Sequence, residues 1–257
     1  MLTAILNGKK RGSGLAGLAL HEVEGAEDIL TSSVFERISY FPDLLVDAFL
    51  RELLTTDCHW GAIREFCYWP RLNLDQQQVE PDLLIHAEHS ILIEAKRWDG
   101  ACQQNPLQIA NEIFACLQAK YLRAGDFVLV LGGLPEDEMT IRDQFERNVR
   151  CLLANAGVTT EVKLVLRSWR QLYAAIEKVC SQQAEPAFKR ILNDIESAFA
   201  WHDVRLMPMP WLHDMPTASP AKLACDTVNL WRPGTNVHFG RLDIAWGFTT
   251  ECFDYWR

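Results

Sequence analysis

The spacing of apolar residues predicts alternating helical and extended segments as far as about residue 200. Between residues 26 and 54, apolar positions recur every three to four residues, which is the period of an amphipathic helix. Pro42 divides this run into two helices, because proline cannot continue a helix. Three extended segments follow, and a polar turn at Glu88 between the last two indicates a hairpin. Their ranges are 66–74, 79–87 and 90–96.

Beyond this hairpin the pattern alternates between helices and strands. Ser168 and Gln171 form a capping-box signature that opens one further helix. The other helical stripes cover residues 109–121, 141–152 and 188–199, and buried strands are expected at residues 127–131 and 162–166. This order predicts an α/β domain with a mixed central sheet flanked by helices, antiparallel in its first part and parallel afterwards.

The pattern also divides the chain into three parts. Residues 1–20 are expected to form a flexible N-terminal arm, and residues 21–200 form the α/β domain. Residues 201–257 are expected to form a Pro- and Trp-rich extension, because five of the nine tryptophans lie there. This aromatic extension either packs on the core or on a partner, or it is a plain β appendage.

Composition places the protein among soluble globular proteins. It has 257 residues, of which 49% are hydrophobic and 23% charged. No apolar run reaches the length of a membrane span and the N-terminus lacks the order of a secretory signal, so we expect a cytoplasmic protein without a membrane partner. The eight cysteines are scattered without a CxxC pair, which favours reduced thiols over disulfides. A zinc site at Cys58, His59 and Cys67 is the nearest alternative.

Three ionisable residues on the apolar hairpin carry the chemical signal. Asp82 precedes the apolar triplet LLI, while Glu94 and Lys96 follow the apolar triplet ILI and point to the same face of a strand. Such groups are costly to bury unless they are paired or bound to metal. Two converging carboxylates suit a hard divalent cation such as Mg²⁺, and Lys96 can position a water, act as a base or stabilise phosphate charge. The alternative is a salt bridge between Asp82 and Lys96 on an exposed strand face.

The segments Pro81-Asp82 and Glu94-Ala95-Lys96 resemble the two half-motifs of the PD-(D/E)xK nuclease superfamily. The resemblance covers about residues 22–180 and implies a restriction-endonuclease-like fold. It implies that Asp82 and Glu94 bind Mg²⁺, for which Mn²⁺ can substitute, and that Lys96 helps to activate the attacking water. An acid of the first helix often completes such a site, with Glu27 of the Glu27-Asp28 pair as the first candidate. The helix after the second half-motif often supplies a glutamine, for which Gln108 is the first match and Gln104 the second.

The resemblance implies a metal-dependent endonuclease that hydrolyses DNA and leaves a 3′-hydroxyl and a 5′-phosphate. A role in bacterial defence against foreign DNA follows only by analogy with the superfamily. Two other functions stay open: a non-catalytic module of the same fold that binds a partner protein or nucleic acid, and a nuclease that acts on RNA.

Net charge and nearby residues bear on how DNA would be bound. The formal net charge of −9 argues against passive coating of nucleic acid, so docking requires a homo-oligomer or a partner subunit with basic surface. Arg97 and Trp98, at the expected mouth of the cleft, are candidate DNA contacts. The basic run at residues 9–11 is either a mobile tail or a phosphate contact, and His86 and His89 are expected to be solvated turn residues.

Overall fold

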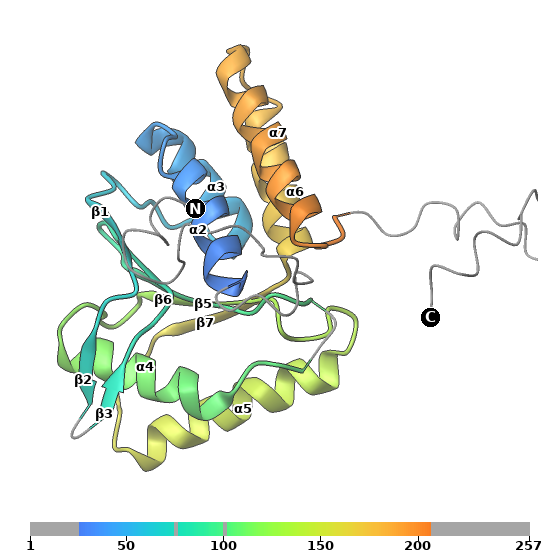
Figure 1. Ribbon diagram of the computed structural model, residues 1–257. Helices are drawn as coiled ribbons and strands as arrows, with labels where there is room; N and C mark the ends of the chain where they lie inside the picture. The colour runs from blue at the N-terminus through green and yellow to red at the C-terminus, as the bar shows by residue number, and fades with distance from the viewer. Residues whose placement is uncertain (1–25, 75–76, 100–101, 207–257) are drawn as a thin grey trace, which may run out of the picture. The chain divides into compact units, whose positions relative to one another are not determined.

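The computed structural model describes residues 26–74, 77–99 and 102–206, and these form a mixed α/β domain (Figure 1). The predicted arm at residues 1–20 and most of the predicted extension at residues 201–257 lie outside the described residues. The helices are α2 (Ala26–Ile38), α3 (Asp43–Leu54), α4 (Pro106–Gln118), α5 (Met139–Asn155), α6 (Trp169–Cys180) and α7 (Pro186–Trp201). The strands are β1 (Glu65–Tyr68), β2 (Leu72–Leu74), β3 (Gln77–Val79), β4 (Leu83–His86), β5 (Ile91–Ala95), β6 (Phe127–Leu131) and β7 (Lys163–Arg167).

Five strands form the central sheet in the order β1-β4-β5-β6-β7. Strands β1, β4 and β5 pair antiparallel, whereas β5, β6 and β7 pair parallel, as the sequence pattern predicted. The predicted hairpin is the β4–β5 pair, in which Leu83 lies opposite Ile93 and Ile85 opposite Ile91. The parallel strands are connected through α4 and α5, which is the connection that parallel pairing requires.

The prediction of single strands over residues 66–74 and 79–87 was wrong in detail. Each is split into two strands, and the inner pair, β2 and β3, forms a separate two-stranded hairpin. The breaks fall at Trp69, whose φ is +47°, followed by Pro70, and at Pro81. Proline has no N–H for a sheet ladder, and a non-glycine residue with positive φ interrupts extended backbone.

Each face of the sheet is covered by its own helices (Figure 1). Helices α2, α3, α6 and α7 pack on one face, and their apolar side chains meet those of Leu83, Ile93 and Leu129. Helices α4 and α5 and strand β2 pack on the other face against Leu84 and Leu92. Alternate residues of each buried strand therefore face different helices, and Glu94 belongs by this alternation to the α4 face.

Local sequence signals set several helix ends. The predicted capping box is present: the Ser168 side chain accepts a hydrogen bond from the Gln171 N–H, and the Gln171 side chain accepts one from the Ser168 N–H. Asn105 caps α4 by accepting a hydrogen bond from the Leu107 N–H, and Pro106 occupies the first helical turn. This cap fixes where α4 starts, and therefore which of its residues face the end of β5.

The domain continues past the predicted boundary at residue 200. Helix α7 includes Trp201, and the following His202 and Val204 are 0% and 7% exposed. The six cysteines in the described part of the chain are free thiols, which confirms the prediction for them. Across the described ranges we find no helix with the length and apolar character needed to cross a bilayer.

Candidate active site

The hairpin brings Asp82, Glu94 and Lys96 to the same end of the sheet. Glu94 lies in β5, Lys96 follows its last residue, and Asp82 immediately precedes β4. Because Leu83 pairs with Ile93, Asp82 lies level with Glu94. One carboxylate oxygen of Asp82 accepts a hydrogen bond of 2.8 Å from the Ala95 N–H, which fixes Asp82 against the end of β5.

Lys96 connects the hairpin to the first turn of α2. Its Nζ lies 2.6 Å from Oε1 of Glu94 and 3.1 Å from Oε1 of Glu27. The other carboxylate oxygen of Glu27 accepts a hydrogen bond of 3.1 Å from the Arg97 N–H. Glu27, proposed from the resemblance, therefore reaches the same cluster from 70 residues away. Asp82 is only 7% exposed, and Lys96 pairs with the two glutamates, so these residues do not form the alternative exposed Asp82–Lys96 salt bridge.

Helix α4 contributes one predicted residue and one that the sequence reasoning missed. The Gln108 Nε2 donates to Oε1 of Glu94 at 2.6 Å and to Oε1 of Glu112 at 2.9 Å. Gln108 thus bridges two carboxylates and orients Glu94. Glu112 follows Gln108 by four residues, a spacing that places both on one helix face and could have identified it. The second candidate, Gln104, instead donates to the backbone carbonyls of β6 and Gly132.

The carboxylates are buried with too few hydrogen-bond donors. Glu94 and Glu112 are 2% and 1% exposed, and the Oε2 atom of each has no hydrogen-bond partner among the described residues. Burial, reinforced by their mutual repulsion, raises the pKa of Glu94 to about 8, and burial raises the pKa of Glu112 to about 7. Burial and the neighbouring Glu94 also hold the pKa of Asp82 well above its ordinary value. Such strongly perturbed carboxylates are typical of functional sites.

The environment of Lys96 favours its charged form. Burial alone would lower its pKa, but the carboxylates of Glu94 and Glu27 outweigh burial and raise the pKa above its ordinary value. Lys96 therefore stays protonated at neutral pH. The direction of this shift is opposite to the lowering that a lysine base needs, and it favours Lys96 as a hydrogen-bond donor and a positive charge.

Two glycines after β6 permit the approach of Lys96. Gly132 and Gly133 have φ of +64° and +70°, a conformation that favours glycine. A Cβ atom on Gly132 would lie 2.2 Å from the Lys96 carbonyl oxygen, and one on Gly133 would lie 2.7 Å from the Lys96 Cβ. The pair therefore allows close packing beside the cluster.

The residues after Lys96 lie in different environments. Arg97 is 6% exposed, and its Nε and Nη2 donate to the carbonyl oxygen of His202 at 3.3 and 3.0 Å. The structure thus gives Arg97 an internal role and does not place it at a surface where DNA contact was expected. Trp98 is partly exposed, and the Arg97 guanidinium lies 4.3 Å from its ring centroid. Trp98 remains a candidate nucleic-acid contact.

The remaining candidate residues from the sequence analysis are not part of the cluster around Glu94 and Lys96. His86 and His89 are partly buried at the opposite end of the hairpin, and Nδ1 of His89, whose side chain is 38% exposed, lies 3.5 Å from Oδ1 of Asp126. His59 pairs with Asp47. Within the described ranges, no group of three or more His, Cys, Asp or Glu side chains is arranged to hold a metal ion, so the Cys58–His59–Cys67 zinc alternative has no support. The basic run at residues 9–11 lies outside the described residues.

Comparisons with known proteins identify a relative but no described activity. No family model matches the chain, and no solved structure matches it. The chain is 35% identical over 219 residues to a Pasteurella multocida (strain Pm70) protein described as "Uncharacterized protein PM0110". The match covers 84% of this chain and 85% of the relative. The chain therefore belongs to the same family as PM0110 of Pasteurella multocida.

Proposed function

We propose that the protein is a metal-dependent nuclease with a restriction-endonuclease-like core that hydrolyses phosphodiester bonds of DNA. One observation carries the proposal. The buried Glu94 carboxylate is held by Lys96 and Gln108 through one oxygen, while its other oxygen has no donor among the described residues. Asp82 lies beside it with a raised pKa. A carboxylate held in this way is poised to accept a positive ligand.

The residues present fit a hard divalent cation. Although the described residues contain no ready-made group of three metal-binding side chains, Mg²⁺ usually binds proteins through only one or two carboxylates and keeps several waters. Asp82 and Glu94 would supply these carboxylates, Glu27 would assist, and Mn²⁺ suits the same oxygen donors. Binding a cation would also favour the ionised forms of carboxylates whose burial opposes ionisation.

A bound divalent ion supplies charge neutralisation at the phosphate and lowers the pKa of a coordinated water. The chain's own residues supply orientation. Gln108 fixes the rotamer of Glu94, and Glu27 and Glu94 hold the Lys96 ammonium from two sides. From this position Lys96 donates hydrogen bonds to the attacking water or to a phosphate oxygen, where negative charge develops during in-line attack.

DNA would bind through a local surface, because the negative net charge of the whole protein does not attract it. Because the formal net charge is −9, we propose that a second copy or a partner subunit supplies additional basic surface. Trp98, two residues after Lys96 and partly exposed, offers an aromatic face to a nucleobase. The proposed place of action is the cytoplasm, and defence against foreign DNA remains the analogy on which the biological role rests.

A cleavage assay tests the proposal. The purified full chain is incubated with supercoiled plasmid, linear duplex, single-stranded DNA and RNA, with Mg²⁺, Mn²⁺ or EDTA. We expect metal-dependent cleavage of DNA that falls at least about a hundredfold in Lys96→Ala and Glu94→Gln, in line with the loss of a group that stabilises a transition state. The matched control is Glu146→Gln, which alters an exposed glutamate paired with Arg150.

Three outcomes would redirect the assignment. Cleavage that persists in Asp82→Asn and Glu94→Gln proteins would remove these residues from the site. Cleavage of RNA alone would change the substrate class. Tight metal-independent binding of nucleic acid without cleavage by any protein would favour the non-catalytic module. Circular dichroism of each variant excludes loss of folding as the reason for lost activity.

A further inference from the structure

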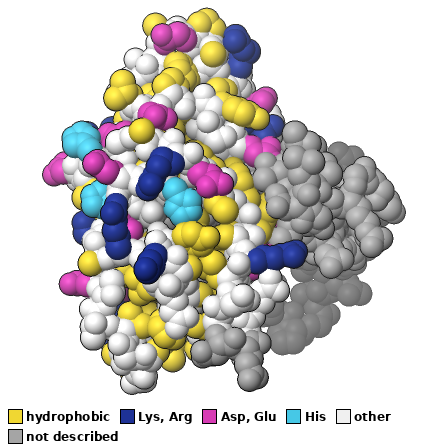
Figure 2. Space-filling view, turned by 90° about the vertical axis from the view of Figure 1, so that its left-hand side faces the viewer, with side chains coloured by type: hydrophobic (Ala, Val, Ile, Leu, Met, Phe, Trp, Pro, Cys, Tyr) yellow, Lys and Arg dark blue, Asp and Glu magenta, His cyan; other side chains and the backbone are white. Residues whose placement is uncertain are grey.

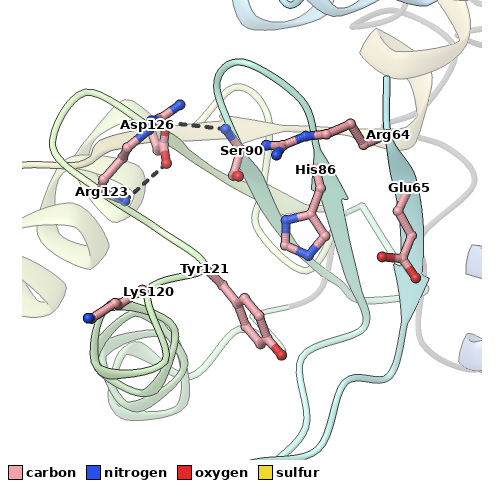
Figure 3. A pocket seen from close by; sticks show the side chains of 8 residues that line it. All are labelled: Arg64, Glu65, His86, Ser90, Lys120, Tyr121, Arg123 and Asp126. Atoms are coloured by element: carbon pink, nitrogen blue, oxygen red, sulfur yellow. Dashed lines mark hydrogen bonds and ion pairs between the residues drawn. The ribbon is translucent and has the colours of Figure 1, made fainter. Parts of the chain in front are cut away.

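A hollow lies at the end of the sheet opposite the acidic cluster formed by Glu27, Asp82, Glu94, Lys96 and Glu112 (Figure 3). It lies where β4 ends and where β5 and β6 begin, beyond the last turn of α4, and it has a volume of about 470 Å³. This volume is in the range of pockets that bind small organic ligands. Its lining residues are Arg64, Glu65, His86, Ser90, Lys120, Tyr121, Arg123 and Asp126. We call it the distal pocket.

Three cationic side chains from separate segments line the distal pocket. Arg64 precedes β1, and its guanidinium donates to the Ala87 carbonyl oxygen. Arg123 lies before β6 and donates to the Glu88 carbonyl oxygen. Lys120 is exposed, and within the described ranges its ammonium has no ion-pair partner. Three cations around one hollow of a chain with net charge −9 indicate an anionic ligand. Figure 2, seen from the side on which β1 lies in Figure 1, shows Lys, Arg and His side chains close together, with Asp and Glu side chains among them.

The two carboxylates of the lining offset part of this positive charge, since Oδ1 of Asp126 lies 3.9 Å from Nε of Arg123, but three cations and two carboxylates still leave one net positive charge. Asp126 is 1% exposed, and its oxygens accept hydrogen bonds from the N–H groups of Ser90 and Arg123 at 3.2 and 3.0 Å. Asp126 is therefore a structural acid committed to the protein. Glu65 lies on β1, across the pocket from Lys120 and Arg123 (Figure 3). An anion is consequently favoured on the side formed by Lys120 and Arg123.

Two planar side chains provide a second kind of contact. The rings of His86 and Tyr121 have centroids 5.3 Å apart and planes inclined by 58°. Tyr121 is 41% exposed, so part of its ring is open to a ligand. Burial lowers the pKa of His86, which keeps its ring neutral at physiological pH and able both to donate and to accept a hydrogen bond. A flat heterocycle with polar edges matches this surface.

We propose that the distal pocket binds a nucleoside phosphate, with the phosphate held by Lys120 and Arg123 and the base against Tyr121 and His86. A free phosphate ion would leave most of the 470 Å³ unfilled and the two rings unused. The ligand is either a free mononucleotide or a nucleotide within a nucleic-acid strand, since both present the same phosphate and base. The pocket and the acidic cluster use different residues, so this proposal stands independently of the nuclease activity.

Calorimetric titration with adenosine 5′-monophosphate in EDTA tests the proposal. We expect saturable binding, and binding of adenosine or inorganic phosphate alone that is at least about tenfold weaker. Lys120→Gly is the sharpest variant, because Lys120 has a φ of +61° and glycine removes the ammonium while favouring the same backbone. We expect about tenfold weaker binding in Lys120→Gly, as for loss of one charge-assisted contact.

Control variants show whether the nucleotide binds in the distal pocket or elsewhere on the protein. Tyr121→Ala should weaken nucleotide binding about tenfold through lost stacking. Arg150→Ala, which removes an exposed arginine of α5, should bind as the wild type does. Undetectable binding at millimolar nucleotide, or equal affinity of the wild type and Lys120→Gly, would overturn the proposal.

A 5′-phosphorylated tetranucleotide distinguishes the two sources of the ligand. If it binds at least about tenfold tighter than the mononucleotide and loses this affinity in Lys120→Gly, the pocket holds a nucleic-acid strand. Equal or weaker binding of the tetranucleotide, with the mononucleotide still dependent on Lys120, assigns the pocket to a free nucleotide. Both results support a nucleoside phosphate as the ligand.

Discussion

Two almost fully buried carboxylates at opposite ends of neighbouring parallel strands are held in different ways. Asp126, before β6, is 1% exposed, and Glu94, near the end of β5, is 2% exposed. Asp126 accepts two backbone hydrogen bonds and lies 3.5 Å from Nδ1 of His89 and 3.9 Å from Nε of Arg123. Glu94 has Lys96 and Gln108 on one oxygen, and its other oxygen has no donor among the described residues.

This difference separates an acid that stabilises the fold from one that we propose to be functional. A buried carboxylate with its hydrogen bonds satisfied contributes to stability, whereas one left partly unsatisfied costs stability and is retained for another reason. Burial alone would not have distinguished the two residues. The distribution of donors over the two oxygens does, because Asp126 accepts one backbone hydrogen bond on each oxygen whereas Glu94 accepts both of its hydrogen bonds on one. The following experiments test that reasoning.

The largest expected effect is at Asp126. Asp126→Ala leaves the N–H groups of Ser90 and Arg123 without their acceptor, so we expect a loss of about 3 kcal/mol in unfolding free energy. Urea denaturation monitored by circular dichroism measures this loss. The control is Asp57→Ala, which removes a fully exposed carboxylate near Arg51 and should change stability by less than about 0.5 kcal/mol. If both substitutions change the unfolding free energy only slightly, Asp126 is not a structural acid and does not differ from Glu94 in the way described.

A slightly smaller loss of unfolding free energy is expected on substitution of Gly132, which lies against Lys96. Gly132→Ala should cost about 2 kcal/mol, from left-handed backbone strain together with the contact between its Cβ and the Lys96 carbonyl. Gly157→Ala is the matched control, because Gly157 has a φ of +74° but no atom within 4 Å of the added Cβ. It should show only the strain, about 1 kcal/mol. Equal losses of unfolding free energy in the two variants, measured by thermal or urea unfolding, would mean that the contact with the Lys96 carbonyl does not affect stability.

Substitution of Glu94 is expected to raise the unfolding free energy, whereas the two preceding substitutions lower it. Folding raises the pKa of Glu94 from 4.5 to about 8, so between these values the folded protein keeps a proton that the unfolded chain has released. Stability in EDTA should therefore fall as pH rises from about 5 to about 8. Glu94→Gln removes the contribution of Glu94 to this dependence, leaving those of Glu112 and Asp82, and should be about 1 to 2 kcal/mol more stable than the wild type at pH 8. A less stable variant at that pH would show that Glu94 is a structural acid like Asp126.

The smallest expected change in stability is at Lys120, which lines the distal pocket. Lys120→Gly should raise the unfolding free energy by about 0.5 kcal/mol, because glycine relieves the strain of a positive φ at the end of α4. Differential scanning calorimetry would detect the accompanying rise in melting temperature. A marked destabilisation would mean that the Lys120 side chain stabilises the fold, and would weaken its use as a test of ligand binding.

Local signals predicted most of the fold. The period of apolar residues located the helices, and the alternation around Glu88 located the β4–β5 hairpin that carries Asp82, Glu94 and Lys96. The splitting of the strands at Pro70 and Pro81 was missed, although both prolines were visible. Apolar β-favouring residues on either side outweighed them in the pattern, and the existence of a separate β2–β3 hairpin depends on packing against α4.

The site was predicted less completely than the fold. Gln108 and Glu27 were proposed from a resemblance, and the structure brings both to Glu94 and Lys96. Glu112 was missed, since an acid on an amphipathic helix looks like a surface residue until the start of α4 is fixed by its Asn105 cap. Arg97 was expected at the surface, but the position of its acceptor, His202, depends on how α7 packs, which the local sequence does not encode.

The contact between Glu27 and the Lys96–Arg97 segment has a consequence for synthesis of the protein. This contact joins residues about 70 positions apart, and Gln108 lies still further along the chain. A ribosome-bound chain that has emerged only as far as the hairpin lacks α4, and a fragment that begins after α2 lacks Glu27. The cluster is therefore complete only once α2, the hairpin and α4 have all been synthesised and have folded together.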